Sequence, residues 1–429
     1  MVPSPTRRRL LAASGAVAGA LGSSRLLTSA RSTATGRSSS STRSPPATRS
    51  FLSDSAPGGA WPMAQHDPAG RNHAPSATPP KDGAAVRWKR EIDIDRGFGY
   101  APTPIVAEGR VYAAGRELLV LDAETGAVEF RVARRSRTPP AVASARAYRS
   151  PTLAVTSSRG VTGLHANGGL RILGSHLGVT RWKGGDSDRQ TAFFGAEPQT
   201  SPPVVAGGTI LVAATDELRA IDASSGKTRW RKDVDTRRPA VHRGTVYAAE
   251  YPGGVRGYDL ETGEDRFDAE VDVAPPLSVT AGPDQLVVAT DDGLAGLSYD
   301  GETRWEFAPE EFSRDYGAVA LAEGVAYAGF RGEDDSYLVA VDAADGSERW
   351  RSETAPEETP QFAPPSVADG VVYVPTEDGG MAAVDAGDGH LRWQFGKDAD
   401  THGPWSPAAL VGETLYAIGD GHVYALEEP

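Results

Sequence analysis

A short pattern built around Asp, Gly and Trp recurs along the chain at intervals of 37 to 52 residues. Residues Ala220–Trp230 carry one copy, and Ala340–Trp350 and Ala383–Trp393 keep the same Asp, Gly and Trp. Two copies end in Phe instead of Trp, one is shortened, and one has lost its Asp. A repeat of this length is a supersecondary unit that buries its apolar face only against its neighbours. The chain is therefore limited to a stacked array or a closed ring of such units.

Each copy follows two short apolar runs that a Gly-containing turn separates, as in residues 201–212 and 364–374. With the two runs inside the pattern itself, one unit contains four short apolar segments joined by turns. This arrangement predicts a four-stranded antiparallel sheet. Four-stranded units that recur about every 40 to 45 residues are typical of β-propeller blades.

The last copy, residues 406–426, supplies only three of its four strands. Its missing outer strand should contain an Arg-Trp pair, and Val86–Ile92 at the front of the domain has one. An N-terminal strand in that place would complete the last blade and remove open sheet edges. We therefore predict an all-β fold over residues 60–429: an eight-bladed β-propeller of four-stranded antiparallel blades, closed by Val86–Ile92.

The residues of the pattern have structural explanations. Gly supplies a positive φ for a tight turn, Asp hydrogen-bonds its own turn backbone, and Trp fills the space between adjacent blades. We assign these structural roles to Trp88, Asp122, Gly126, Gly178, Trp182, Asp222, Gly226, Trp230, Asp259, Gly263, Gly301, Trp305, Asp342, Gly346, Trp350, Asp385, Gly389 and Trp393. The degenerate copy at about 149–184 leaves open whether the second blade is regular.

The Ala-x-Asp-x-x-x-Gly-x-x-x-Trp unit resembles the repeat of the pyrroloquinoline-quinone-like (PQQ-like) propellers. Residues Trp61–Pro68 resemble a short segment that precedes the ring in secreted members of that family. The family includes quinoprotein alcohol dehydrogenases and a non-enzymatic lipoprotein of the outer-membrane protein assembly machinery. The resemblance therefore implies the propeller fold, but leaves open whether the protein is a scaffold or an enzyme.

The enzymes of this family would be expected to hold the quinone with Ca²⁺, a catalytic Asp and a vicinal disulfide. The chain has no Cys, so the disulfide is excluded, as are thiolate metal sites and Cys nucleophiles. The acidic turns at Asp93–Asp95 and Glu333–Asp335 lack the spaced oxygens of a Ca²⁺ loop, and the eight His are scattered. We expect no catalytic residues, no metal site and no cofactor; PQQ with Ca²⁺ belongs only to the enzyme alternative.

The N-terminal residues have the composition of an export signal. Arg7 and Arg8 precede an apolar run from Leu10 to Gly22, which is similar to a twin-arginine signal and too short to span a membrane. We assign residues 1–30 to this signal and residues 31–59 to a disordered Ser/Thr/Arg/Pro tether. A disordered basic tail is the alternative for the first segment. Export in soluble form, without a transmembrane anchor, is the expectation.

Charge is distributed unevenly along the chain. The formal charge is −13, yet residues 1–53 hold eight Arg and no acid, so the remainder carries −21. Such a body argues against nucleic-acid binding, which needs a basic patch. Six Lys stand against 38 Arg. An acidic, Lys-poor surface is typical of proteins that stay hydrated in concentrated salt, so we expect a halophilic, haloarchaeal source.

Function in a propeller is expected in the loops at the mouth of its central channel. Four segments are longer than a minimal blade needs or lie at the equivalent place: 95–100, 133–149, 184–200 and 397–405. Their basic and aromatic residues suggest a site for an anionic or planar ligand, or for an acidic segment of a partner. The alternative is that they pair with nearby acids and fill the channel. The candidate residues are Phe98, Tyr100, Arg134, Arg135, Arg137, Tyr148, Arg149, His402 and Trp405.

The sequence as a whole favours a secreted, monomeric propeller that acts as a protein-interaction or ligand-binding scaffold at the cell surface. Its partner would be a surface or secreted protein, or a small ligand at the channel mouth. The alternative is a PQQ-dependent dehydrogenase of alcohols or sugars.

Overall fold

The computed structural model divides the chain into two units, Met1–Ala47 and Thr48–Pro429. All of the residues that the structure describes belong to the second unit. The described residues are 59–94, 101–133, 136, 138–157, 160–172, 175–177, 179–184, 201–214, 216–250, 253–273, 278–309, 313–316, 318–331, 336–352, 363–376, 379–396 and 405–429. The predicted export signal and tether therefore lie outside them.

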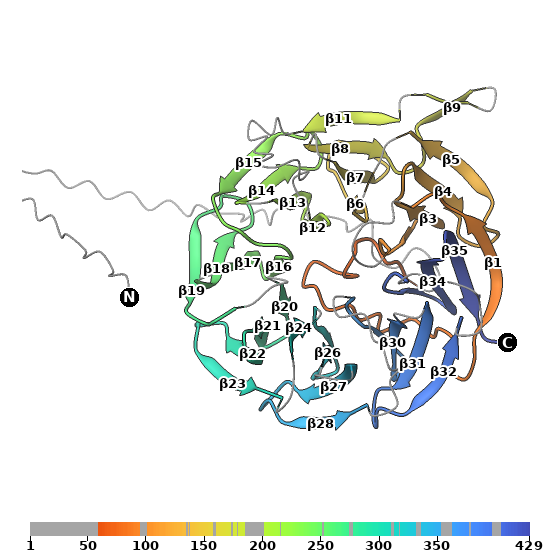
Figure 1. Ribbon diagram of the computed structural model, residues 1–429. Coiled ribbons are helices and arrows are strands. Elements are labelled where there is room, and N and C mark those ends of the chain that lie inside the picture. The colour runs from red at the N-terminus through yellow and green to blue at the C-terminus, as the bar shows by residue number, and fades with distance from the viewer. Residues whose placement is uncertain are drawn as a thin grey trace, which may run out of the picture. The chain divides into compact units, whose positions relative to one another are not determined.

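Eight sheets are arranged around a ring in the second unit (Figure 1). Blade 1 contains β2 (Ile105–Ala107), β3 (Arg110–Ala113), β4 (Leu118–Asp122) and β5 (Val128–Val132). Blade 2 contains β6 (Ala141–Ala143), β7 (Thr152–Ser157), β8 (Gly160–His165) and β11 (Thr180–Gly184). Blade 3 contains β12 (Val204–Ala206), β13 (Thr209–Ala214), β14 (Glu217–Asp222) and β15 (Thr228–Lys232). Blade 4 contains β16 (Ala240–His242), β17 (Thr245–Glu250), β18 (Gly254–Asp259) and β19 (Asp265–Ala269).

The second half of the ring repeats this order. Blade 5 contains β20 (Val279–Ala281), β21 (Gln285–Thr290), β22 (Gly293–Ser298) and β23 (Thr303–Phe307). Blade 6 contains β25 (Ala320–Ala322), β26 (Val325–Arg331), β27 (Ser336–Asp342) and β28 (Glu348–Arg351), with β24 (Ser313–Tyr316) as an additional partner of β26. Blade 7 contains β29 (Ser366–Ala368), β30 (Val371–Thr376), β31 (Gly380–Asp385) and β32 (Leu391–Phe395).

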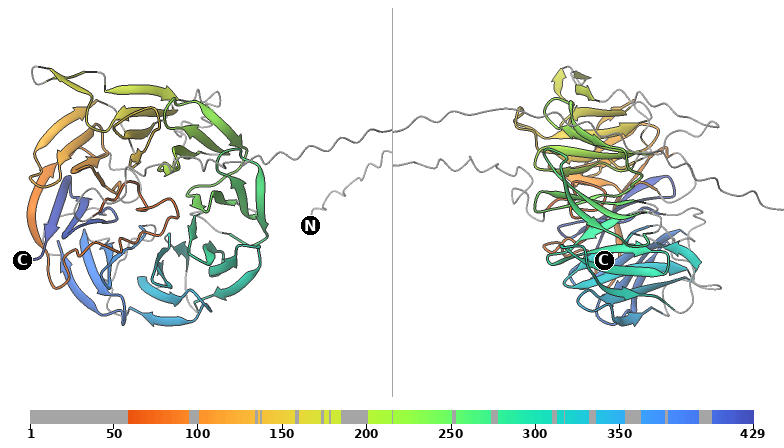
Figure 2. Two further views of the ribbon diagram at one scale, coloured as in Figure 1. Left: turned by 180° about the vertical axis from the view of Figure 1, so that it is seen from behind. Right: turned by 90° about the vertical axis from the view of Figure 1, so that its left-hand side faces the viewer.

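Blade 8 closes the ring with strands from both ends of the domain. β33 (Ala409–Val411), β34 (Thr414–Gly419) and β35 (His422–Glu427) are followed in the sheet by β1 (Ala85–Glu91). Ala85 pairs with Glu427 and Glu91 with His422 in antiparallel register, with a bulge between Val86 and Trp88. The predicted eight-bladed β-propeller and its closure by an N-terminal strand are confirmed. Figure 2 shows the ring from behind and edge-on.

In five blades, a Trp of the outer strand packs against the next blade and hydrogen-bonds to it. The indole N–H of Trp182 in β11 donates to the carbonyl of Ala223 in blade 3, at 2.9 Å. Gly226 lies under the same ring, where an added Cβ would stand 2.4 Å from the indole, and its φ of +72° suits glycine. Trp88, Trp230, Trp305 and Trp350 make the corresponding hydrogen bond to Ala123, Leu260, Ala343 and Ala386.

The recurring Asp organises the turn that follows it. The Oδ1 of Asp342 accepts the N–H of Ala344 at 2.8 Å, and its Oδ2 accepts from Arg349 at 2.7 Å. These two hydrogen bonds hold the pKa of Asp342 below its usual value. Asp222 with Arg229 and Asp385 with Arg392 repeat the pair.

Blade 2 is a regular four-stranded sheet with one addition. A two-stranded hairpin, β9 (Leu170–Ile172) with β10 (Ser175–Leu177), replaces the tight turn between β8 and β11. The glycine that packs under the aromatic residue of blade 1 is Gly168, whose added Cβ would lie 2.9 Å from the Phe130 ring. Gly178, to which we assigned that place from the sequence, lies outside the described residues.

Candidate functional site

The structure describes three of the nine predicted channel-mouth residues, and these three do not form one group. Six of them lie outside the described residues: Phe98, Tyr100, Arg134, Arg135, Arg137 and His402. The other three are Tyr148, Arg149 and Trp405, and the structure places them in different settings.

Trp405 belongs to the core of the ring. Its side chain is 1% exposed, and its indole stacks on Tyr424 with ring centroids 4.7 Å apart. Phe395 meets it edge-on at 5.7 Å, and an added Cβ at Gly419 would stand 2.3 Å from it. In this position the indole shapes the wall between blades 7 and 8 and offers no face to a ligand.

Tyr148 and Arg149 lie at the opposite end of blade 2 from residues 138–140. The segment 133–149, which we treated as one loop from the sequence, is interrupted by the inner strand β6. Residues before β6 connect blades 1 and 2, whereas Tyr148 and Arg149 belong to the turn between β6 and β7. Because β6 runs across the sheet, the two halves of the segment emerge at opposite ends.

Tyr148 stacks on a cation. The guanidinium of Arg181 lies 4.1 Å from the centre of the Tyr148 ring and donates to the Ser150 carbonyl at 3.0 Å. Its other amino group lies 3.1 Å from Nδ1 of His165. Burial, followed by the Arg181 charge, holds the pKa of His165 below its usual value, so this imidazole is neutral.

The centre of the ring is occupied by the chain that precedes β1. This central segment, residues 60–80, runs along the inner strands of the blades (Figures 1 and 2). The backbone of Trp61 both donates a hydrogen bond to Val106 of blade 1 and accepts one from it. Other backbone groups of the segment form at least one hydrogen bond with each of blades 2, 4, 5, 6, 7 and 8. The partners in those six blades are Val142, Val241, Ala281, Leu321, Val367 and Gly412.

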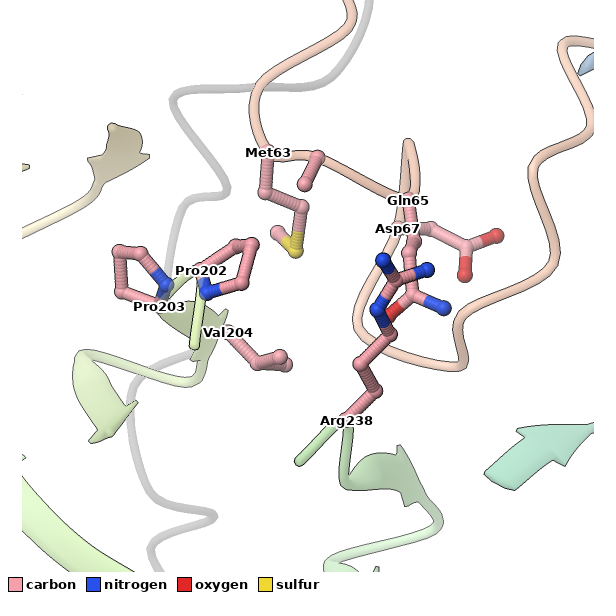
Figure 3. A pocket seen from close by; sticks show the side chains of 8 residues that line it. Met63, Gln65, Asp67, Pro202, Pro203, Val204 and Arg238 are labelled. Carbon is pink, nitrogen blue, oxygen red and sulfur yellow. The ribbon is translucent and has the colours of Figure 1, made fainter. Parts of the chain in front are cut away.

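Blade 3 is the exception among the described residues. Pro62 bonds to blade 2 and Pro68 to blade 4, while the turn between them makes no backbone hydrogen bond to β12. A small pocket lies there (Figure 3). It is lined by Met63, Ala64, Gln65 and Asp67 of the central segment, by Pro202, Pro203 and Val204 of blade 3, and by Arg238.

Two charged side chains of the central segment, Asp67 and Arg71, are paired with each other, whereas two buried amides are not fully hydrogen-bonded in the structure. Asp67 accepts from Nε of Arg71 at 2.7 Å. Burial alone would raise the pKa of Asp67, but the His66 side chain 3.7 Å away and the charge of Arg71 outweigh it, so the pKa is lowered. The buried amides of Gln65 and Asn72 present atoms that have no hydrogen-bond partner in the structure.

These groups can donate and accept hydrogen bonds, but they do not form a catalytic arrangement. Among the described residues, no three His, Asp or Glu side chains come close enough to hold a metal ion. The donor set there does not fit a quinone with Ca²⁺, so we derive no redox step. Our sequence reasoning found Trp61–Pro68 as a motif but missed that its backbone lines the ring, because such contacts leave no side-chain pattern.

Comparison with known proteins gives the family. The sequence profile of outer membrane protein assembly factor BamB matches residues 166–306 and 283–428. The chain belongs to this family. It is thus a PQQ-like repeat propeller similar to BamB. Of the curated BamB proteins, that of Yersinia pestis is 26% identical over 44% of this chain and 53% of its own. That of Moranella endobia is 24% identical over 52% and 60%, so the chain spans less than two thirds of both.

Solved structures share the fold of this BamB-family chain. BamB from Moraxella catarrhalis has a TM-score of 0.56 and 17% identity, over 80% of this chain and 100% of its own. A quinohemoprotein alcohol dehydrogenase from Pseudomonas putida has a TM-score of 0.62 and 13% identity, over 86% and 81%. At such identities the likeness concerns the fold alone. In the part of the chain that the structure describes, no helix is long and apolar enough to cross a membrane.

Proposed function

We propose that this protein is an exported scaffold that binds another protein through the loops of its eight-bladed ring. Membership of the BamB family supports a role in protein interaction, since its relatives are named as assembly factors. The observation that carries the proposal is the central segment. It fills the middle of the ring with backbone hydrogen bonds to seven blades, so the surfaces open to a partner are the ends and edges of the blades.

Export by the twin-arginine route is part of this proposal. The pair Arg7-Arg8 and the apolar run that follows support it, and the Lys-poor acidic body supports a halophilic source. Replacing both residues (Arg7→Lys, Arg8→Lys) should retain the full-length protein in the cytoplasm, as measured by cell fractionation. Unchanged export of this variant would contradict the assigned route.

Crosslinking of the tagged full-length protein in its own cells tests the scaffold role. We expect the crosslink to capture one partner protein, and we expect substitutions in the loops of the ring to reduce the yield of that crosslink. A parallel titration with PQQ and Ca²⁺, followed by quinone absorbance and melting temperature, tests the dehydrogenase alternative. Saturable quinone binding with dye reduction, and no partner, would overturn the scaffold proposal.

A further inference from the structure

Blade 2 and its flanks contain no acidic residue. From Phe130 to Gly185 there is no Asp or Glu, although residues 54–429 hold all 57 acids of the chain. At that density a stretch of this length would hold about eight acids. The same stretch carries ten Arg and Lys, six of them between Ala141 and Gly184, the bounds of blade 2.

Blades farther round the ring have the opposite composition. Blade 5 (residues 279–307) contains six acids and one Arg, and blade 7 (residues 366–395) contains five acids and one Arg. Blade 6 (residues 320–351) contains seven acids and three Arg. The ring is therefore polarised, with one strongly basic blade on a strongly acidic body.

The cations of blade 2 also differ in their partners. Elsewhere most of the described cations pair with acids, as Arg229 does with Asp222 and Arg392 with Asp385. The structure describes five cations of blade 2: Arg146, Arg149, Arg171, Arg181 and Lys183. None of them lies within ion-pair distance of a carboxylate of the described residues. Their charge is available to an external anion.

Four of these cations lie at the same end of the blade. Arg146 and Arg149 lie in the β6–β7 turn, and Arg171 lies in the β9–β10 hairpin between β8 and β11. In an antiparallel four-stranded sheet these two connections emerge at the same end. Arg181, at the start of β11, joins them through its bonds to Ser150 and its stacking on Tyr148. Arg146, Arg149 and Arg171 are exposed.

We propose that this end of blade 2 is the docking surface for an acidic segment of a partner protein. The proposal rests on the scaffold function proposed above and names its surface and the chemistry of its partner. Arg guanidinium groups bind carboxylates in a bidentate manner, and a basic patch on an acidic body speeds and orients the approach of an acidic segment.

Two other occupants fit less well. A nucleic acid would extend beyond this one basic blade and would be repelled by the rest of the protein, because residues 54–429 carry a charge of −21. A second copy of this chain would offer acidic blades whose repeat Asp residues are already paired with Arg, as Asp342 is with Arg349. An acidic segment of another protein brings carboxylates without such partners.

The test is fluorescence anisotropy of a short labelled peptide of alternating Glu and Gly, titrated with the purified ring in the lowest salt that keeps it folded. The double variant Arg149→Glu, Arg171→Glu reverses two charges of the surface. The matched control is Arg243→Glu, Arg304→Glu, which makes the same charge change at exposed residues of blades 4 and 5. We expect the first variant to weaken binding by at least about tenfold and the control by less than about threefold.

The same pair of variants tests the partner found by crosslinking. Equal weakening by both variants, no binding of the peptide by the wild type, or tighter binding of a DNA of equal charge would overturn the proposal. Self-association that Arg149→Glu, Arg171→Glu abolishes would identify a second copy instead and overturn it as well. A crosslinked partner that binds this variant as tightly as the wild type would overturn the docking surface alone and leave the scaffold function standing. Arg149→Lys, Arg171→Lys keeps the charge and should restore most of the binding.

Discussion

The contact between blades 2 and 3 and the contact between blades 1 and 2 fill the same kind of space with different residues. In the first, Trp182 covers Gly226 and donates a hydrogen bond to Ala223. In the second, Phe130 covers Gly168, and His176 of the added hairpin lies against it with ring centroids 4.9 Å apart. Trp supplies both the volume and the hydrogen bond, whereas the smaller Phe needs a second ring to complete the packing.

Blades 4 and 5 show the same substitution. Phe267 takes the Trp position, and Tyr247 meets it edge-on at 5.2 Å. Tyr299 of blade 5 continues the group and stacks on His242 at 5.0 Å, with their planes 9° apart. Both contacts that have Phe in place of Trp thus also contain a His ring. The Trp is therefore replaceable, and where a glycine lies beneath the ring, as Gly226 does beneath Trp182, the lack of space requires it.

The largest effect should come from that glycine. Gly226→Ala places a methyl group against the Trp182 ring at a backbone position with φ of +72°. We expect it to lower the free energy of unfolding by about 3 kcal/mol, from backbone strain and overpacking together. Urea denaturation followed by Trp fluorescence measures it.

Gly109→Ala is the matched control. It has nearly the same φ, +70°, and an added Cβ there meets no atom within 4 Å. Strain alone should cost about 1 kcal/mol. Equal losses at the two positions would show that the contact with Trp182 is not what requires glycine.

Reciprocal exchange of the aromatic residues should have the next largest effect. Trp182→Phe leaves the buried Ala223 carbonyl without its donor and creates a small cavity, at a cost of about 2 kcal/mol. Phe130→Trp should not stabilise the protein, because Gly168 and His176 already fill the space. Removing the competing ring with His176→Ala should make Phe130→Trp less harmful. A double-mutant cycle in urea that shows no coupling would contradict this account.

The ring itself could be predicted from the sequence because its contacts repeat. The last copy lacks an outer strand with an Arg-Trp pair, and Val86–Ile92 contains one, so this strand could be placed in the last blade. The repeat could be recognised in the sequence because side chains make its contacts. Where the structure uses only backbone groups, as the central segment does, the sequence carries no comparable pattern.

The candidate site was harder to predict for a related reason. The inner strand β6 is three small apolar residues, Ala141–Ala143, which the sequence does not distinguish from the loop around them. Missing it joined Tyr148 and Arg149 to a loop at the other end of the blade. Trp405 lies outside the Asp-Gly-Trp pattern, so only its packing against Tyr424 identifies it as core.

Acid should weaken the contact between blades 4 and 5, which contains His242, more than the contacts that contain Trp. Burial holds the pKa of His242 below its usual value, as it does for His73 and His165. The unfolded chain therefore binds these protons first, and stability should be lost as the pH falls below about 6.5. Melting temperatures between neutral and mildly acidic pH measure the loss, and His242→Gln should reduce it. An unchanged slope in this variant would remove His242 from the explanation.

The smallest effects should come from the Asp–Arg pair of the repeat, and their order is informative. The Arg349 side chain is 47% exposed, so solvent screens its attraction to Asp342, and Arg349→Ala should cost about 0.5 kcal/mol or less. Asp342→Ala also removes the acceptor of the Ala344 N–H and should cost about 1 kcal/mol. If urea denaturation gives this order, the turn hydrogen bond explains why Asp recurs from blade to blade. The reverse order would assign that role to the ion pair. Blade 2, whose described cations have no described carboxylate partner, would then lack a source of stability that the other blades have.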